Sequence, residues 1–464
     1  MDMFEIEGAR PLRGTVRAGG SKNACLPLIT AALLSEEPTV IQGVPNLRDI
    51  REMVGLVRHL GARVEHGEGR IEIDPSSFST ESVPYEIMRK MRASFYAMGP
   101  MIARLGRAKV SLPGGCAIGD RPVDLHLRGF HALGVRMGRS AGYVLARHEG
   151  LTGTRLSLMG TNGTSVGATC NVLMAAALAR GTTIIDDAAR EPEVIELCRF
   201  LNSMGARIQG EGTNRLRIEG VERLRGTRWQ VSPDRIEAAT LAIAGLITHG
   251  DVVLENMPRE YMGATLLALE NWGADLEWRG ENTLRVRRTR GPKRPLQIVT
   301  EPYPGFPTDA QPQLTALLAL TPGKSAVRET IYAERFMHVP ELKRLGARIT
   351  TPERGRIEIA GTSALEGAAV MASDLRAGAA LILAALAAHG TSQVRRIYHV
   401  ERGYEKLEEK LASLGAHIRR VPESGDDPGL AETAKALKET EVSATLVDGG
   451  PPVTPARTIG TPLA

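Results

Sequence analysis

The stretch DIREMVGLVRHLGARV, Asp49–Val64, contains the pattern that decides the fold. Its apolar residues recur in steps of three and four, at Ile50, Met53, Val54, Val57 and Leu60. This is the spacing of one buried helix face. Gly61 follows directly, and glycine is the residue type that most readily ends a helix in left-handed backbone. The stretch therefore predicts an amphipathic helix, a glycine stop and a short strand.

The same pattern returns five more times along the chain. The corresponding glycines are Gly134, Gly205, Gly273, Gly346 and Gly415. Neighbouring copies are about 70 residues apart, a period typical of a repeated supersecondary unit. Four residues before each of the six glycines the side chain is apolar: Val57, Phe130, Leu201, Leu269, Leu342 and Leu411. The chain is therefore expected to consist of six copies of one unit.

Each unit also has an earlier and more apolar helix. Clear examples are SVGATCNVLMAAALARG (165–181) and ASDLRAGAALILAALAAHG (372–390). A strand-like run, such as TTIIDDAA (182–189), separates the two helices. The unit reads as helix, strand, helix, strand, which predicts an α/β fold. Six such units are too many for one compact domain, so we expect two similar domains of three units each.

Composition excludes several classes of protein. The chain has 464 residues, of which 42% are hydrophobic, and a formal net charge of +5. No Lys/Arg run is interleaved with aromatic residues, so we expect no nucleic-acid partner. No apolar run is long enough to span a bilayer and no secretion signal precedes the first unit, so we expect no membrane insertion. The cysteines, which show neither metal-ligand nor disulfide spacing, favour a reducing cytoplasm: Cys25, Cys116, Cys170 and Cys198.

Charged and polar residues gather where the predicted helices begin. The earlier helices open with Lys22-Asn23, Arg92, Ser165, Asp234-Arg235, Thr308-Asp309 and Asp374–Arg376. The later helices open near Asp49, Arg121, Glu191, Arg335 and Arg402. Helix N-termini favour anions, and arginine recognises phosphate and carboxylate groups. The set predicts a binding site for small anions, although any single member could be an ordinary cap or surface charge.

Ten motifs carry a resemblance to a known family. They are GGSKNACLP (19–27), MRASFYAMGP (91–100), LPGGCAIGDRPVDL (112–125), SVGAT (165–169), AAREPE (188–193), PDRIE (233–237), FPTDAQPQ (306–313), RFMHVPEL (335–342), SDLRAGAAL (373–381) and YHVERGYE (398–405). In this order they resemble the UDP-N-acetylglucosamine 1-carboxyvinyltransferases of the enolpyruvyl transferase family. The resemblance ends at about Val421.

The resemblance implies an inside-out α/β barrel of two domains with three units each. We expect a first, lid-bearing domain at 22–232 and a second domain formed by 1–21 with 233–422. The segment 423–464 is rich in Pro, Gly, Ser, Thr and charge and is expected to be a disordered tail.

The implied reaction transfers the enolpyruvyl group of phosphoenolpyruvate to the 3-hydroxyl of UDP-N-acetylglucosamine. Phosphate leaves after an addition and an elimination. This is the first committed step of peptidoglycan synthesis, and the family requires no metal or organic cofactor. The partners are therefore two small-molecule substrates, and a monomer is compatible with the sequence.

The resemblance also implies which residues take part in catalysis. Asp309 matches the proposed general base for the sugar hydroxyl. Cys116 lies in the glycine-rich segment that matches a mobile lid, and the resemblance implies that it donates a proton during addition or helps product release. It also matches the target of the antibiotic fosfomycin. Nearby arginines are expected to lower the pKa of its thiol. Lys22, Arg402 and Asp374 complete the expected set, as cations at the phosphoenolpyruvate end and a carboxylate that orients them or takes part in proton transfer.

Further residues match positions that contact the substrates. They are Lys22, Asn23, Arg92, Arg121, Pro122, Val123, Asp124, Ser165, Val166, Gly167, Asp309, Ile331, Arg335, Arg376 and Arg402. Asp49 and Glu191 are expected to hold these residues in place. Two departures stand out. Gly163 replaces a lysine common in the family, and Glu334 replaces a neutral residue beside Arg335.

Three alternatives remain open from the sequence. A 3-phosphoshikimate 1-carboxyvinyltransferase shares the expected fold but lacks the lid cysteine motif and the RPVD segment (121–124). A relative that acts on another uridine nucleotide is kept open by Gly163. A protein that binds the UDP-sugar without turnover is the third, and the joint presence of Cys116, Lys22 and Asp309 argues against it.

Overall fold

The computed structural model describes residues 2–112, 123–161, 163–288, 291 and 293–423. The chain up to Glu423 forms one compact unit. The predicted tail lies, from residue 424 on, outside the described residues. Within the part of the chain that the structure describes, we find no helix whose length and hydropathy would let it span a bilayer.

Each repeat contributes one four-stranded sheet, and all six sheets share one pairing pattern. In the second repeat β6 (Ser82–Val83) runs parallel to β7 (Arg107–Ser111). Strand β7 pairs antiparallel with β9 (Tyr143–Arg147), which pairs antiparallel with the edge strand β8 (Arg136–Ser140). Side chains alternate along these strands, so that Val144 is buried while Leu145 is exposed. One face of each sheet is thereby available to a core.

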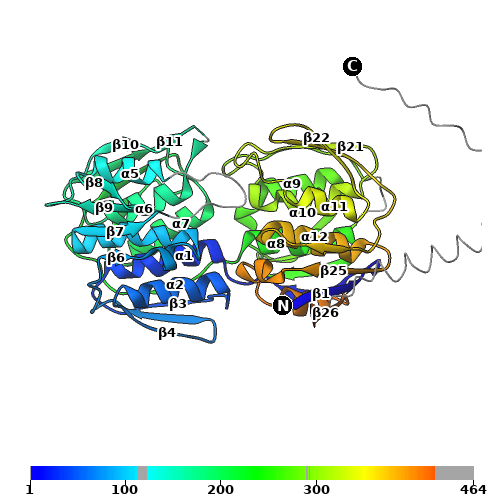
Figure 1. The fold of residues 1–464 in the computed structure, drawn as a ribbon, viewed down its shortest axis with the longest axis horizontal. Helices are drawn as coiled ribbons and strands as arrows, with labels where there is room; N and C mark the ends of the chain where they lie inside the picture. The colour runs from blue at the N-terminus through cyan, green and yellow to red at the C-terminus, as the bar shows by residue number, and fades with distance from the viewer. Residues whose placement is uncertain (1, 113–122, 162, 289–290, 292, 424–464) are drawn as a thin grey trace, which may run out of the picture. The chain divides into compact units, whose positions relative to one another are not determined.

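The other five sheets repeat this order, as β16-β3-β5-β4, β10-β13-β15-β14, β2-β17-β19-β18, β20-β21-β23-β22 and β24-β25-β1-β26. Figure 1 shows the chain as a ribbon, with strands such as β3, β21 and β25 labelled. Their strands are β1 (Asp2–Glu7), β2 (Arg13–Arg17), β3 (Thr39–Gln42), β4 (Arg63–Gly67), β5 (Arg70–Asp74), β10 (Arg155–Ser157), β13 (Thr182–Asp186), β14 (Arg207–Gln209), β15 (Arg215–Glu219), β16 (Arg228–Gln230), β17 (Asp251–Glu255), β18 (Ala274–Trp278), β19 (Thr283–Arg288), β20 (Gln297–Val299), β21 (Lys324–Arg328), β22 (Arg348–Glu353), β23 (Arg356–Ala360), β24 (Ala369–Met371), β25 (Thr391–Arg395) and β26 (His417–Pro422). A separate hairpin pairs β11 (Met159–Gly160) with β12 (Gly163–Thr164).

The helices fall into the two expected series. The earlier helices are α1 (Lys22–Ala31), α6 (Val166–Ala176), α8 (Arg235–Ile247), α10 (Gln311–Ala319) and α12 (Leu375–Ala387). The later helices are α2 (Arg48–His59), α5 (Asp124–Ala132), α7 (Pro192–Ser203), α9 (Gly263–Trp272), α11 (His338–Arg344) and α13 (Leu407–Ser413). Short elements fill the rest: α3 (Tyr85–Met88), η1 (Ala32–Leu34), η4 (Arg259–Tyr261), η5 (Thr308–Ala310) and η6 (Ile397–Arg402). The helix–strand–helix–strand unit predicted from the repeat is confirmed.

The earlier helix of the second repeat differs from the uninterrupted helix that the sequence pattern predicts. It is divided into the 3-10 segment η2 (Arg92–Ala97), one α-turn α4 (Met98–Pro100) and the π-helical η3 (Met101–Leu105). Pro100 lies in the middle of this segment. Because proline lacks an N–H and crowds the carbonyl four residues earlier, regular α-helix is not maintained through it.

The six repeat glycines behave as the pattern predicts. Their φ angles are positive, from 92° at Gly346 to 113° at Gly273, which is the left-handed region that favours glycine. The apolar residue four positions earlier is almost fully buried in every copy, with at most 1% of its surface exposed. The repeat is thus a helix that ends at its glycine and turns directly into an edge strand.

Two segments link the first three repeats with the last three. Strand β2 near the N-terminus pairs with β17 of the fourth repeat, and β16 pairs with β3 of the first. Strand β1 completes the sixth sheet by pairing with β25 and β26. The chain therefore crosses from one set of repeats to the other twice, once before α1 and once before α8. This arrangement supports the domain limits 22–232 and 233–422, which stay a prediction.

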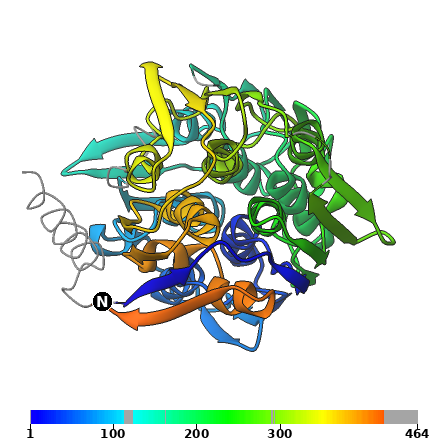
Figure 2. The same cartoon turned by 90° about the vertical axis from the view of Figure 1, so that its right-hand side faces the viewer.

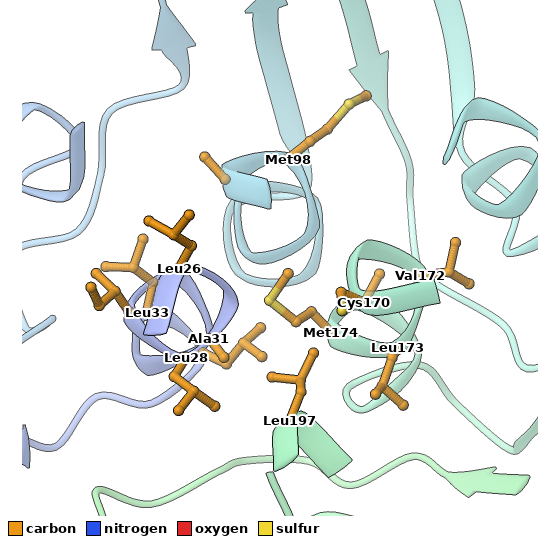
Figure 3. Packing of buried hydrophobic residues seen from close by; sticks show 14 of the residues in the cluster. Leu26, Leu28, Ala31, Leu33, Met98, Cys170, Val172, Leu173, Met174 and Leu197 are labelled. Carbon is orange, nitrogen blue, oxygen red and sulfur yellow. The ribbon is translucent and has the colours of Figure 1, made fainter. Parts of the chain in front are cut away.

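Each set of three repeats encloses its own hydrophobic core. One core runs from Ala24 to Val231, and the other joins Phe4–Ala18 to the segment from Ala238 to Ile418. Figure 2 shows helices close to end-on in the middle of the second set, with strands around them. In the first core Met174 of α6 lies toward α1, and Leu197 of α7 points toward both (Figure 3). Helices inside and sheets outside are the inside-out barrel arrangement expected from the resemblance.

Candidate active site

Asp309 lies at the centre of a compact group of charges. It belongs to η5, directly before α10. Its Oδ1 is 2.7 Å from Nη1 of Arg335, and its Oδ2 is 3.1 Å from Nη2 of Arg376. Oδ2 also accepts a hydrogen bond of 3.4 Å from Nδ2 of Asn23. Because Asn23 belongs to α1 and the other residues to the second set of repeats, the group joins the two cores.

The charges of this group decide the protonation of Asp309. Burial alone would raise the pKa of its carboxyl, but Arg335, Arg376 and Lys22 outweigh burial and hold the pKa well below its ordinary value. Burial would likewise lower the pKa of Arg335, and Asp309 and Asp374 outweigh it in turn. The group is therefore fully ionised at neutral pH, with the carboxylate between two guanidinium groups.

Arg335 and Arg376 each have N–H donors that no described residue accepts. Arg376 is 1% exposed and its guanidinium lies 5.3 Å from the ring centroid of Tyr404. Its Nε and Nη1, and Nε of Arg335, are buried and have no hydrogen-bond acceptor within the described residues. Buried donors of this kind are normally satisfied. Their arrangement fits an anionic ligand with several oxygen atoms.

Asp49 forms the centre of a second charged group beside the first. Its Oδ2 is 3.2 Å from Nζ of Lys22, and its Oδ1 accepts a hydrogen bond of 2.9 Å from Nε of Arg402. Only 6% of the Asp49 side chain is exposed. Lys22 begins α1, whereas Arg402 ends η6. One carboxylate from α2 thus holds cations from both sets of repeats.

Two helix caps place the residues around these groups. Ser21 caps α1, and Lys22 donates its backbone N–H to Asp234 at 3.3 Å. Asp374 caps α12, where its Oδ1 accepts from the backbone N–H groups of Arg376 and Ala377 at 2.8 and 3.0 Å. Asp374 therefore fixes the start of the helix that carries Arg376, and its role in proton transfer stays a prediction.

Glu191 lies at the start of α7 in surroundings of a different kind. Its Oε1 accepts a hydrogen bond of 3.3 Å from the backbone N–H of Tyr303, while Oε2 is buried without a partner among the described residues. Burial raises the pKa of this carboxyl. The neighbouring Glu193 pairs instead with Arg235 of α8, with Oε–N distances of 3.1 and 3.3 Å.

A cavity of about 610 Å³ lies where the hairpin β11–β12 meets the loop after β21. It is lined by Met159, Thr161, Gly163, Thr164, Asp187, Ala188, Arg190, Asn214, Glu301, Pro302, Thr330 and Ile331. Ser165 follows this hairpin and caps α6, so Val166 and Gly167 form the first turn of that helix. Gly163 has a φ of 89°, a conformation that a lysine would adopt only with strain.

The remaining expected residues are less closely connected. Val123 and Asp124 begin α5, and Arg92 begins η2. Burial, with a contribution from the charge of Arg92, lowers the pKa of His126 to about 3. Cys116, Arg121 and Pro122 lie outside the described residues. Among the described residues, no three His, Cys, Asp or Glu side chains are placed to hold a metal ion together.

Two features of the site had no signal in the sequence pattern. Glu329 is a buried carboxylate, 3% exposed, whose hydrogen bonds reach both the Asp309 segment and the Ile331 loop. Glu334 was expected to add charge near Arg335, but its carboxylate pairs with Arg354 at 2.7 Å on the surface. Both arrangements depend on which loops the fold brings together, so no spacing in the sequence reveals them.

Comparison with known proteins places the chain among the carboxyvinyltransferases. The family model described as EPSP synthase (3-phosphoshikimate 1-carboxyvinyltransferase) matches residues 6–411. A UDP-N-acetylglucosamine 1-carboxyvinyltransferase from Methylacidiphilum infernorum is 50% identical over 421 residues, 91% of this chain and 99% of the relative. One from Gluconacetobacter diazotrophicus is 50% identical over 426 residues, 91% of this chain and 100% of the relative.

Solved structures give the same picture of the fold. The enolpyruvyl transferase NikO from Streptomyces tendae superimposes with a TM-score of 0.83 at 25% identity, covering 91% of this chain and 99% of the other. An EPSP synthase from Acinetobacter baumannii superimposes with a TM-score of 0.70 at 19% identity, covering 91% of this chain and all of the other, and supports the fold alone.

Proposed function

The chain belongs to the EPSP synthase family and, within it, to the UDP-N-acetylglucosamine 1-carboxyvinyltransferases, and from this premise we infer how its residues share the reaction. The enzyme transfers the enolpyruvyl group of phosphoenolpyruvate to the 3-hydroxyl of UDP-N-acetylglucosamine and releases phosphate. This is the first committed step of peptidoglycan synthesis, on which cell shape and division depend. We place the reaction in the cytoplasm.

The observation that carries our assignment of roles is the group formed by Asp309, Arg335 and Arg376. Phosphoenolpyruvate carries a phosphate and a carboxylate, and the arginines offer buried donors that have no acceptor among the described residues. Arg335, Arg376 and Arg402 therefore hold these two groups, with Lys22 beside them. Preorganised cations stabilise the charge that develops as the phosphate departs.

Asp309 acts as the general base for the sugar hydroxyl. In the free enzyme its pKa is held well below the ordinary value, and a carboxylate in that state is a weak base. Substrate phosphate and carboxylate compete with Asp309 for Arg335 and Arg376. As the guanidinium groups turn to the substrate, the pKa of Asp309 rises and its ability to accept the hydroxyl proton increases.

The remaining steps of the reaction form and break bonds as follows. The deprotonated hydroxyl oxygen bonds to C2 of phosphoenolpyruvate, and C3 gains a proton, so that a tetrahedral ketal forms. The bond from C2 to the phosphate oxygen then breaks, and C3 loses a proton to restore the double bond. We assign the first C3 proton to the Cys116 thiol and expect Lys22 and Asp374 to assist the transfers.

The UDP-sugar takes the side of the site that includes the start of α6. Ser165, Val166 and Gly167 form this helix start, which favours a diphosphate, and Ile331 lines the cavity beside it. Asn23 lies within hydrogen-bond reach of the base. Arg92, Arg121, Pro122, Val123 and Asp124 complete the proposed contacts with the nucleotide.

The assignment of Cys116 has its own test. Cys116→Ala is expected to lose most of its turnover and its covalent inactivation by fosfomycin, while Cys198→Ala, on a buried face of α7, keeps both. Turnover and inactivation at the parent rates in Cys116→Ala would contradict the assignment.

The decisive experiment is phosphate release from phosphoenolpyruvate by the purified protein, with and without UDP-N-acetylglucosamine. Release that depends on the UDP-sugar is expected, with the enolpyruvyl ether of that sugar as the product. Shikimate 3-phosphate and UMP serve as competing acceptors. Release with UMP alone would move the assignment to another uridine nucleotide, and release with none would favour a protein that binds without turnover.

A further inference from the structure

We propose that Glu329 is a positioning residue that holds Arg335 against Asp309 through the hydroxyl of Thr308. The inference rests on the proposed function and extends the site by two residues, Glu329 and Thr308. Glu329 follows β21 directly and is 3% exposed. No lysine or arginine of the described residues forms an ion pair with it, so hydrogen bonds must satisfy its carboxylate.

One oxygen of Glu329 shapes the loop that carries Ile331. Its Oε1 accepts from the backbone N–H groups of Ile331 and Tyr332 at 2.9 and 3.1 Å. It also accepts from Oγ1 of Thr300 at 2.7 Å. The carbonyl of Tyr332 accepts in turn from the backbone N–H of Arg335 at 2.8 Å. The backbone that leads to the arginine is therefore fixed from this one oxygen.

The other oxygen reaches the side chain of the same arginine. Oε2 of Glu329 accepts from Oγ1 of Thr308 at 2.9 Å. Oγ1 of Thr308 accepts from Nη1 of Arg335 at 3.0 Å, and the same Nη1 is 2.7 Å from Asp309. A hydroxyl has one hydrogen and two lone pairs. Because Glu329 takes the hydrogen, the lone pairs of Thr308 face the guanidinium.

The carboxylate therefore sets the direction of a short chain from Glu329 through Thr308 and Arg335 to Asp309. A carboxylate can only accept, so it prevents Thr308 from turning its hydrogen toward the arginine. An amide at this position can donate as well. If Glu329 merely stabilised the fold, an amide of equal size would lower stability without distinguishing one substrate from the other.

Glu329→Gln separates the two functions of the residue. The amide oxygen can replace Oε1 and keep its three donors, while the amide nitrogen replaces Oε2 and donates to Thr308. Arg335 loses a well-directed acceptor, so kcat/KM for phosphoenolpyruvate is expected to fall about 10-fold, as for loss of a hydrogen bond to a charged group. KM for UDP-N-acetylglucosamine is expected to stay within about 2-fold, because the Ile331 loop keeps its acceptor.

Variants of Thr308 test the same series of hydrogen bonds, because Thr308 lies between Glu329 and Arg335. Thr308→Val removes the hydroxyl at nearly constant volume and is expected to show the same selective loss. Thr308→Ser keeps the hydroxyl and is expected to restore kcat/KM. The double variant Glu329→Gln with Thr308→Val is expected to lose no more than the worse single variant, because residues that act in one chain are not additive.

Glu196→Gln is the matched control. Glu196 is also a buried carboxylate, accepting from Nε1 of Trp229 and the backbone N–H of Ser232 at 3.0 Å each and from the Ser232 hydroxyl, and within the described residues none of these donors belongs to a proposed site residue. It is expected to leave both kinetic constants within about 2-fold. Unchanged kcat/KM for phosphoenolpyruvate in Glu329→Gln and Thr308→Val, with an active parent, would overturn this inference alone. A parent that releases no phosphate would overturn the proposed function and this inference with it.

Discussion

Asp309 and Glu191 are two partly buried carboxylates of the proposed site, and their surroundings shift their pKa values in opposite directions. Asp309 contacts two guanidinium groups, and its pKa lies well below the ordinary value although burial opposes this. Glu191 accepts from the backbone N–H of Tyr303 and forms no ion pair within the part of the chain that the structure describes, and burial raises its pKa. Burial penalises the charge in both cases, so the direction is decided by the neighbouring cations.

The different surroundings indicate that Asp309, rather than Glu191, lies where an anionic substrate would bind. In the proposed mechanism the cations at Asp309 are held by a charge that substrate displaces, so that binding and activation of the base are coupled. Glu191 forms no ion pair with a cation of the described residues, and its carboxyl holds the loop of Tyr303 through a hydrogen bond. On the proposed mechanism, the neighbouring cations rather than burial therefore distinguish the base from the supporting residue.

Removing the charge of Asp309 is expected to have the largest effect on turnover. Asp309→Asn removes the carboxylate that contacts both Arg335 and Arg376, and with it the proposed base. We expect kcat to fall about 10³-fold, within the range for loss of a general base. The measurement is steady-state phosphate release at saturating concentrations of both substrates.

A surface pair provides the control for this variant. Asp251 on β17 binds Arg285 with N–O distances of 2.6 and 2.7 Å, outside the site. Asp251→Asn is expected to leave kcat unchanged. A kcat for Asp309→Asn within 10-fold of the parent would remove Asp309 from the role of base and leave it a counter-ion only.

Arg376→Met gives the Asp309 carboxylate surroundings closer to those of Glu191, because one of its two contacting cations is removed. One cation disappears at nearly equal side-chain length, so burial is opposed less strongly and the pKa of Asp309 rises. We expect kcat/KM for phosphoenolpyruvate to fall about 10²-fold through lost ligand contacts. We also expect the acid limb of its pH profile to move to higher pH, because Asp309 must be ionised to act as a base.

The substrate titrates equally in both measurements, so the difference between parent and variant profiles reports the enzyme. An acid limb that stays in place while activity falls would show that the ionisation of Asp309 does not limit the reaction.

The sequence alone predicted the repeat unit, but it did not predict the charged surroundings of Asp309 and Glu191. Helix periodicity and the six glycines predicted the unit, because local backbone preferences and one buried face dictate it. The resemblance named Asp309, Arg335 and Arg376 individually. The Asp309–Arg376 pair and the bridge at Asp49 join different repeats, whereas the Asp309–Arg335 pair and the Glu329 hydrogen bonds join separate loops of one repeat. Such contacts depend on how helices and loops pack in three dimensions, and no local spacing encodes them.

Asp49→Asn has an intermediate effect, since it changes a carboxylate that orients cations without being the base. The amide can accept from Lys22 or Arg402 but no longer attracts both by charge. We expect kcat/KM for phosphoenolpyruvate to fall about 10-fold, with KM for the UDP-sugar little changed. A larger effect on the UDP-sugar would place Lys22 and Arg402 at the acceptor instead.

Glu191→Gln gives the smallest effect and tests stability rather than turnover. Because burial raises the pKa of Glu191, the folded protein holds this proton more tightly than the unfolded chain does. The resulting stability is fully present below the ordinary pKa of a glutamate and is lost as pH rises through the raised value. At neutral pH the carboxylate of Glu191 therefore destabilises the folded protein, and an amide at this position removes that destabilisation.

We expect Glu191→Gln to melt about 2 °C higher than the parent at pH 7 and at nearly the same temperature near pH 4. Calorimetry at both pH values checks this. A variant that melts lower than the parent at pH 7 would show that the carboxylate has a cation partner in solution, and the contrast with Asp309 would then disappear.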